Sequence, residues 1–206
     1  MNKKLASKYF KSQNISVVNA FGVNVAFDLN CPLHTSKIMF IGIRPDKCFH
    51  NLVEAVRILN GYDGNFQLYL IGSCSDVIED DYEWLHKVGF TKHPEQYFNK
   101  CSFYVNPADF DSFPVSVLEA MSAGIIPIIT ENTGQSDILR EYGLDFLIIN
   151  NNEPATIARK ILEIYSKPLG WKKRVSMKCK EISRIFSEEN QVKEFKKVFK
   201  EILEKS

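Results

Sequence analysis

The most informative part of the sequence is the stretch Asp109-Phe110-Asp111-Ser112-Phe113-Pro114-Val115-Ser116-Val117-Leu118-Glu119-Ala120-Met121. Seven residues lie between its carboxylates at Asp111 and Glu119. Proline suits the first position of a helix, because its φ is fixed and its missing N–H is not needed there. We therefore predict a helix that begins at Pro114, with Asp111 just before it and Glu119 within it.

The start of this helix is expected to bind an anion. The backbone N–H groups of Phe113, Val115 and Ser116 have no partner inside the helix, and they point outward together with the positive end of the helix dipole. A diphosphate suits such a site without any charged side chain. This favours a ligand that carries phosphates.

The two carboxylates of the stretch differ in their surroundings. Glu119 lies among apolar residues, where an unpaired carboxylate is costly, and its side chain leans toward the helix N-terminus. It therefore calls for hydrogen-bond donors such as ribose hydroxyls. Asp111 has two interpretations, a ligand contact or an ordinary capping or turn residue.

Strands and helices alternate along the chain, which predicts an α/β protein with a single Rossmann-like, doubly wound, mainly parallel sheet and helices on both faces. Ligands of such sheets bind beyond the carboxyl ends of the strands, where Gly42, Gly72, Pro107 and Thr130 fall. The predicted strands are 15–19, 38–43, 66–71, 102–106, 126–130 and 146–149.

The loop from Gly42 to Lys47 joins a strand to a helix and carries two cations. Arg44 offers a planar fork and Lys47 a point charge, and together they could hold two phosphates. The alternative is that both are solvated loop residues.

The stretch 109–121 resembles the E-x7-E signature of retaining GT-B glycosyltransferases of the family-four type, glycosyl transferases group 1. Its usual form is E-G-F-(G/P)-x-x-x-L-E-A-M-A-x-G. Three further segments match the family in the expected order: 37–47, then 66–72 as the next strand, and 88–107 leading into the signature.

The resemblance implies roles for individual residues. Lys47 and Arg44 would stabilise the donor diphosphate, Glu119 would bind the ribose, and Asp111 would orient the donor sugar. No metal or cofactor is implied, and a donor phosphate oxygen would take the acceptor proton. The implied donor-binding residues are Gly42, Gly72, Phe90, Ser112, Phe113, Pro114, Val115, Ser116 and Glu119.

Several positions depart from the family pattern. Asp111 replaces glutamate, so it is one methylene shorter, and Ser112 replaces a frequent glycine. Arg44 stands two residues after Gly42 rather than one, and Cys48 replaces the usual glycine after the lysine. The phosphate role of Lys47 is therefore better supported than that of Arg44. The segment 132–135 resembles a loop that closes over the sugar, and its alternative is an ordinary turn.

The resemblance covers the C-terminal, donor-binding half of such an enzyme. We expect residues 1–206 to form one domain, with a leading helix at 1–14, a closing helix at 188–206 and the N-terminal acceptor domain absent. The chain alone is then expected to be inactive and to need that domain or a partner chain. The alternatives are a non-catalytic nucleotide-binding or regulatory subunit, and a flavodoxin-like module.

Charge is distributed unevenly along the chain. Residues 167–206 carry twelve Lys/Arg and six Asp/Glu, a formal +6, so that residues 1–166 are −5 within a net charge of +1. An apolar stripe in the closing helix is expected to pack on the core beneath a solvated lysine face, and the alternative is contact with anionic lipid. The stripe comprises Val192, Phe195, Phe199, Ile202 and Leu203.

Other classes of function find little support in the sequence. No segment has the roughly 18 apolar residues of a membrane span, and no apolar signal core follows the N-terminus. We expect a cytoplasmic protein, with peripheral contact at the inner membrane face as the variant. Nucleic-acid binding is not expected, because aromatic residues are not interleaved with the basic ones on a recognised fold. The expected small-molecule partner is a UDP-, GDP- or ADP-linked sugar.

Overall fold

The computed structural model describes residues 31–42, 45–62, 64–73, 78–79 and 81–204. Arg44, the predicted leading helix and the predicted strand at 15–19 lie outside these residues. The described part forms a six-stranded, wholly parallel sheet with the order β3-β2-β1-β4-β5-β6. The strands are β1 Lys37–Ile41, β2 Gln67–Ile71, β3 Leu85–Gly89, β4 Phe103–Asn106, β5 Ile126–Thr130 and β6 Ile148–Ile149.

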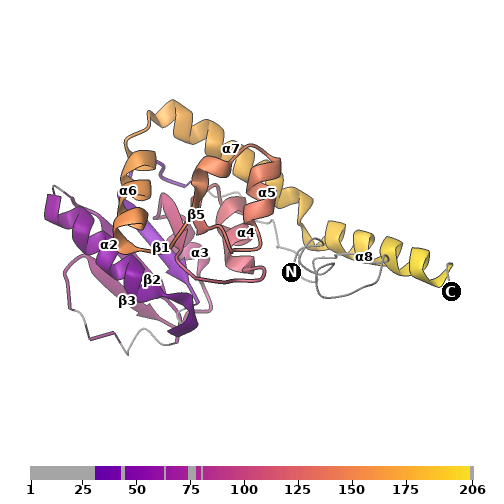
Figure 1. Ribbon diagram of the computed structural model, residues 1–206, viewed down its shortest axis with the longest axis horizontal. Helices are drawn as coiled ribbons and strands as arrows, with labels where there is room; N and C mark the ends of the chain where they lie inside the picture. Colours follow the sequence, from indigo (N-terminus) through magenta and orange to yellow (C-terminus); the bar gives the residue numbers. More distant parts are fainter. Residues whose placement is uncertain (1–30, 43–44, 63, 74–77, 80, 205–206) are drawn as a thin grey trace.

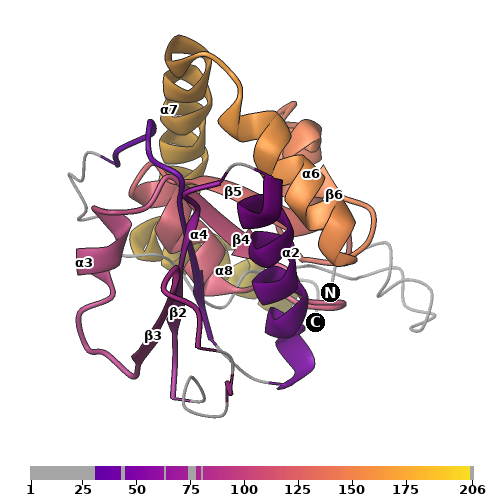
Figure 2. The ribbon, with the colours of Figure 1, turned by 90° about the vertical axis from the view of Figure 1, so that its left-hand side faces the viewer.

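Helices cover both faces of this sheet, as the alternation of strands and helices predicts. Helix α2 packs with α6 on one face and α4 packs with α7 on the other (Figure 1 and Figure 2). The α-helices are α2 Phe49–Tyr62, α3 Glu95–Phe98, α4 Val115–Ser122, α5 Ser136–Glu141, α6 Pro154–Tyr165, α7 Leu169–Ile185 and α8 Glu188–Leu203, and the 3₁₀ helices are η1 Pro45–Lys47 and η3 Asp145–Leu147. The predicted doubly wound Rossmann-like fold is confirmed.

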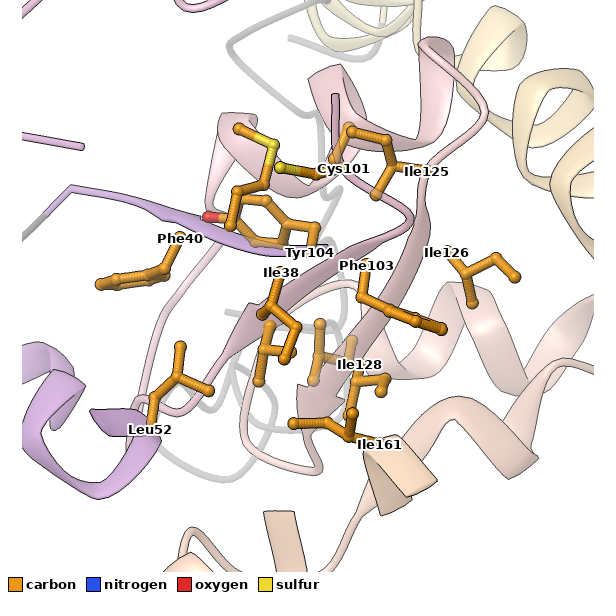
Figure 3. Packing of buried hydrophobic residues seen from close by; sticks show 14 of the residues in the cluster. Ile38, Phe40, Leu52, Cys101, Phe103, Tyr104, Ile125, Ile126, Ile128 and Ile161 are labelled. Carbon is orange, nitrogen blue, oxygen red and sulfur yellow. The ribbon is translucent and has the colours of Figure 1, made fainter. Parts of the chain in front are cut away.

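The core forms where the central strands are buried on both faces. Ile38, Met39 and Phe40 of β1 are each at most 1% exposed, as expected for a strand with helices above and below it. Figure 3 shows Phe40 and Tyr104 from adjacent strands within this packed cluster. The continuous apolar runs of β1, β4 and β5 made these strands predictable from sequence.

Two strands differ from the prediction. Strand β3 was not predicted, because it lies at the edge of the sheet and its sequence contains the polar residues His86 and Lys87. Strand β6 is shorter than the predicted 146–149, because Phe146 belongs to η3 and its ring lies 5.2 Å from that of Trp171.

The signature helix α4 begins at Val115, so the prediction that it begins at Pro114 is wrong by one residue. Pro114 has the expected φ of −66° but an extended ψ of 114°, and it is the capping residue. Its carbonyl accepts a hydrogen bond from Gln135 Nε2 at 2.9 Å. This contact comes from a distant loop, which the local sequence could not reveal.

The closing helix α8 is present at nearly the predicted position, but it does not pack on the core. None of its residues is buried, and Figure 1 shows it extending away from the sheet. The expectation of core packing beneath a lysine face is therefore wrong. The apolar stripe is exposed, at 46% for Val192, 56% for Phe195, 53% for Phe199, 53% for Ile202 and 61% for Leu203.

Candidate donor-binding site

The candidate site lies at the switch point of the sheet, between β1 and β4. The chain leaves β1 toward β2 on one side and leaves β4 toward β5 on the other, so the loops after these two strands diverge. Ligands of open α/β sheets bind at this point. Lys47 follows β1 and Asp111 follows β4, so the topology brings together two residues 64 positions apart in the sequence.

Lys47 and Asp111 form an ion pair across the switch point. Lys47 Nζ lies 2.6 Å from Asp111 Oδ2, and the two side chains are only 11% and 13% exposed. The solvated-cation interpretation of Lys47 is therefore wrong. The Asp111 carboxylate bonds to the side chains of Lys47 and Asn106, and the described contacts include none from it to a backbone N–H of α4, so they do not support the capping interpretation of Asp111. The pair supplies one positive and one negative group, held close to the start of α4.

Asn106 is a member of the site that sequence reasoning missed. It ends β4, is 1% exposed, and its Nδ2 donates to Asp111 Oδ2 at 3.3 Å. A polar side chain at the end of an otherwise apolar buried strand was the available signal. Such a residue needs a hydrogen-bond partner, and Asp111 lies only five positions away.

Residues 130–135 donate hydrogen bonds to the backbone of the loop that leads into α4. Gly134 N donates to Asp111 O at 2.8 Å, and Thr130 Oγ1 donates to Ala108 O at 2.6 Å. Gly134 lies so close that an added Cβ would be 1.9 Å from Ser112 O. For residues 132–135 of this segment, the sequence left two interpretations, a loop that closes over the sugar and an ordinary turn. In the structure the segment fixes the course of the signature loop.

The first turn of α4 presents its backbone N–H groups beside the ion pair. Val115 and Ser116 are partly exposed there, whereas Val117 N bonds to Pro114 O at 3.2 Å. The Ser116 hydroxyl lies 2.7 Å from the buried Tyr104 hydroxyl, which holds the turn against β4. Phe113 is partly buried, like Val115 and Ser116, so the backbone N–H groups of all three remain candidates for the predicted anion site.

Glu119 lies one turn further along α4, and it is partly buried. Burial raises the pKa of its carboxyl above the ordinary value of 4.5. Among the described residues, none donates a hydrogen bond to this carboxylate. Burial, together with the nearby charges of Asp111 and Glu119, also raises the pKa of Tyr104, so both carboxylates act on one buried hydroxyl. Glu119 is suited to accept hydrogen bonds from a ligand hydroxyl.

The remaining predicted residues surround this centre at the carboxyl ends of the strands. Gly42 and Gly72 follow β1 and β2 with positive φ values of 96° and 148°. Phe90 directly follows β3 and is 73% exposed. Cys48, where the family has glycine, has a left-handed φ of 52°, which explains why glycine suits this position.

The described residues contain no group of three or more His, Cys, Asp or Glu that could hold a metal ion. The helices within the same part of the chain are all too short or too polar to cross a membrane.

The fold is that of one Rossmann-like half of the GT-B architecture, and comparison of the sequence with protein-family models identifies the family. The model for Glycosyl transferases group 1 matches residues 35–167, so the chain belongs to this family. The predicted resemblance is thereby confirmed. A comparison with curated proteins finds no match.

Solved structures share the fold at low sequence identity. A crystal structure of TarM aligns with a TM-score of 0.75 and 19% identity, over 96% of this chain and 41% of TarM. A Staphylococcus aureus TarM mutant in complex with Fondaparinux, alpha-GlcNAc-glycerol and UDP aligns at 0.73 with 19% identity, over 96% of this chain and 42% of that one. The catalytic domain of cholesterol-alpha-glucosyltransferase from Helicobacter pylori aligns at 0.58 with 20% identity, over 73% of this chain and 98% of the other. The chain thus spans about two fifths of the length of TarM.

Proposed function

We propose that this chain binds a nucleotide-diphosphate sugar at the switch point and provides the donor site of a retaining glycosyltransferase. The observation that carries the proposal is the Lys47–Asp111 pair, 2.6 Å long, beside the first turn of α4. A cation and free helix N–H groups suit a diphosphate, and a neighbouring carboxylate suits sugar hydroxyls. Membership of the glycosyl transferases group 1 family supports the same reaction class.

In this proposal the residues act on the leaving group rather than on a nucleophile. Lys47 and the N–H groups of Val115 and Ser116 stabilise the negative charge that develops on the diphosphate as the glycosidic bond breaks. Asp111 orients the sugar as it passes through an oxocarbenium-like state, and Glu119 holds the ribose. A phosphate oxygen of the donor receives the acceptor proton on the same face, which gives retention.

Lys47 serves two anions in this proposal. Its ammonium group faces Asp111 in the structure, and in the proposed complex it faces the diphosphate as well. The diphosphate and Asp111 therefore share the same cation. Binding is expected to weaken as salt rises, because charge pairs at a partly exposed site are screened.

We take UDP as the first nucleotide to test, because one of the TarM structures contains UDP. GDP and ADP are the nucleotides to compare with it. We propose that the acceptor is a glycan or lipid-linked sugar in polysaccharide or glycoconjugate synthesis, bound mainly by a second, acceptor-binding half. The stripe of α8 is exposed. We propose that it contacts that half or an anionic membrane surface, and that the enzyme is cytoplasmic, at the inner membrane face.

A non-catalytic nucleotide-binding subunit is the second candidate. It is favoured by one observation, the shorter Asp111 whose Oδ2 is already bonded by Lys47 and Asn106. Such a subunit would bind the nucleotide but would gain no affinity from the sugar.

Isothermal titration with UDP, GDP and ADP tests the donor site. We expect one nucleoside diphosphate to bind, and Glu119→Ala to reduce the affinity at least ten-fold. Glu163→Ala is the matched control, because Glu163 forms an exposed ion pair with Lys160 on α6, and it should leave binding unchanged. If none of the three nucleotides binds the wild-type chain, the proposed donor site is wrong for this chain.

A further inference from the structure

Asn106, at the end of β4, uses both ends of its side-chain amide in hydrogen bonds, one with Ala108 and one with Asp111. Its Oδ1 accepts a hydrogen bond from Ala108 N at 3.2 Å, and its Nδ2 donates to Asp111 Oδ2 at 3.3 Å. The residue is 1% exposed, in a strand whose other members, Phe103, Tyr104 and Val105, are apolar or aromatic and fully buried. A buried amide is retained at low cost only where both its ends are bonded, as they are here.

These contacts make the two oxygens of Asp111 unequal. Oδ2 receives the Lys47 ammonium group at 2.6 Å and the Asn106 amide at 3.3 Å. Oδ1 receives no hydrogen bond from any described residue, so it keeps its capacity to accept one. With one oxygen bonded from two directions, the carboxylate cannot rotate freely and Oδ1 has a defined position.

We propose that Asn106 is a positioning residue, which holds Asp111 so that Oδ1 accepts a hydroxyl of the donor sugar. The inference rests on the proposed function, because it assigns a role within that donor site. The hydrogen bond from Asn106 to Asp111 Oδ2 would restrict the rotation of the carboxylate. Asp111 is one methylene shorter than the glutamate of the family pattern, and a short side chain has to be held in one rotamer to reach its ligand reproducibly.

The competing explanation is that Asn106 only shapes the turn. Its Oδ1 contact to Ala108 N is an Asx turn, which alone would justify an asparagine at this position. The two explanations differ in the use of Nδ2. Serine can keep the turn through its hydroxyl but is too short to reach Asp111, so Asn106→Ser separates the two contacts.

The test is a double-mutant cycle of ligand binding with Asn106→Ser, Asp111→Ala and the double variant. Titrations use UDP, UDP-glucose and UDP-N-acetylglucosamine, or the corresponding conjugates if the wild type binds GDP or ADP instead. The measured quantity is the ratio of the dissociation constant of the sugar nucleotide to that of the free nucleoside diphosphate. This ratio isolates contacts to the sugar from contacts to the phosphates and ribose.

We expect Asn106→Ser to raise this ratio about ten-fold for the sugar that the wild type prefers, with the affinity for the free diphosphate changed by less than about two-fold. We expect Asp111→Ala to raise the ratio at least as much, and the double variant to show no further rise, because both changes remove one interaction. Asn51→Ser is the matched control, since the Asn51 amide donates to Asn152 O rather than to Asp111, and it should leave the ratio unchanged.

Three results would overturn the inference while leaving the donor site intact. The first is an unchanged ratio in Asn106→Ser, the second is equal weakening of the sugar nucleotide and the free diphosphate, and the third is full additivity in the double variant. Absence of nucleotide binding by the wild type would instead overturn the proposed function itself. Circular dichroism and thermal unfolding of each variant show whether a loss of binding comes from a loss of folding.

Discussion

Replacing Gly134 by alanine tests the close support of the signature by segment 130–135. An added Cβ would lie 1.9 Å from Ser112 O, 2.8 Å from Ser112 C and 3.3 Å from Phe113 Cα. All three atoms belong to the backbone, so no side-chain rotation can relieve the contact. The signature loop has to move, and the hydrogen bond from Gly134 N to Asp111 O, 2.8 Å long, is strained or lost.

The expected cost follows from these two effects. Forcing extra atoms into a packed region costs about 1–3 kcal/mol, and losing a hydrogen bond costs about 0.5–1.5 kcal/mol. We therefore expect Gly134→Ala to lower the free energy of unfolding by about 2–4 kcal/mol, which corresponds to a fall in melting temperature of about 5–15 °C for a domain of this size. Because the displaced loop carries Asp111, nucleoside diphosphate affinity should fall as well.

Urea unfolding monitored by circular dichroism measures this change. Gly61→Ala is the matched control, because Gly61 lies in α2 and an added Cβ there meets nothing within 4 Å. That control should range from neutral to about 1 kcal/mol more stable, since alanine favours helix. If Gly134→Ala unfolds within about 0.5 kcal/mol of the wild type, the reasoning from close backbone contact is refuted.

Three further predictions concern the site itself. Lys47→Met leaves Asp111 partly buried without its counterion, so it should lower stability by about 3 kcal/mol in urea unfolding and weaken diphosphate binding at least ten-fold in titration; unchanged affinity would contradict the phosphate role. Cys48 has a left-handed backbone conformation, which is strained for a residue with a side chain and not for glycine. Cys48→Gly should therefore raise the free energy of unfolding by about 0.5–1 kcal/mol in urea unfolding, and a lower free energy of unfolding would contradict this account. The raised pKa of Glu119 means that its contribution to stability is fully present below the unfolded pKa of 4.5 and is lost as pH rises through the higher folded pKa. Glu119→Gln should therefore be more stable than the wild type at pH 8 in urea unfolding, and the difference should be smaller at pH 4. A stability advantage of Glu119→Gln that grows toward acid pH would contradict this assignment.

The parts of the fold that sequence predicted well are those where the local pattern and the tertiary environment agree. Strands β1, β4 and β5 are buried on both faces, so their apolar runs identify them directly. Edge strand β3 has one neighbour and polar residues such as Lys87, so its sequence carries no such signal. The exposure of α8 was not predictable either, because an amphipathic stripe shows that a helix has an apolar face but not what covers it.

In the candidate site, too, the sequence predicted individual residues better than the contacts between them. Glu119 was singled out because a carboxylate in an apolar helix is costly, whereas Lys47 and Asp111 were singled out by their places between a strand and a helix and by their match to the family pattern. The pairing of Lys47 with Asp111 could not be read from sequence, because it depends on β1 and β4 being neighbours in the sheet. The hydrogen bond from Gln135 to the Pro114 carbonyl was not predicted, because it depends on how two loops distant in sequence pack together.

A crystal structure of the chain with its nucleoside diphosphate bound is the most direct test of the central claim. The account predicts the diphosphate within hydrogen-bond distance of Lys47 Nζ and the N–H groups of Val115 and Ser116, with the ribose hydroxyls on Glu119. A nucleotide bound elsewhere, with the Lys47–Asp111 pair undisturbed and Glu119 without a ligand contact, would contradict it.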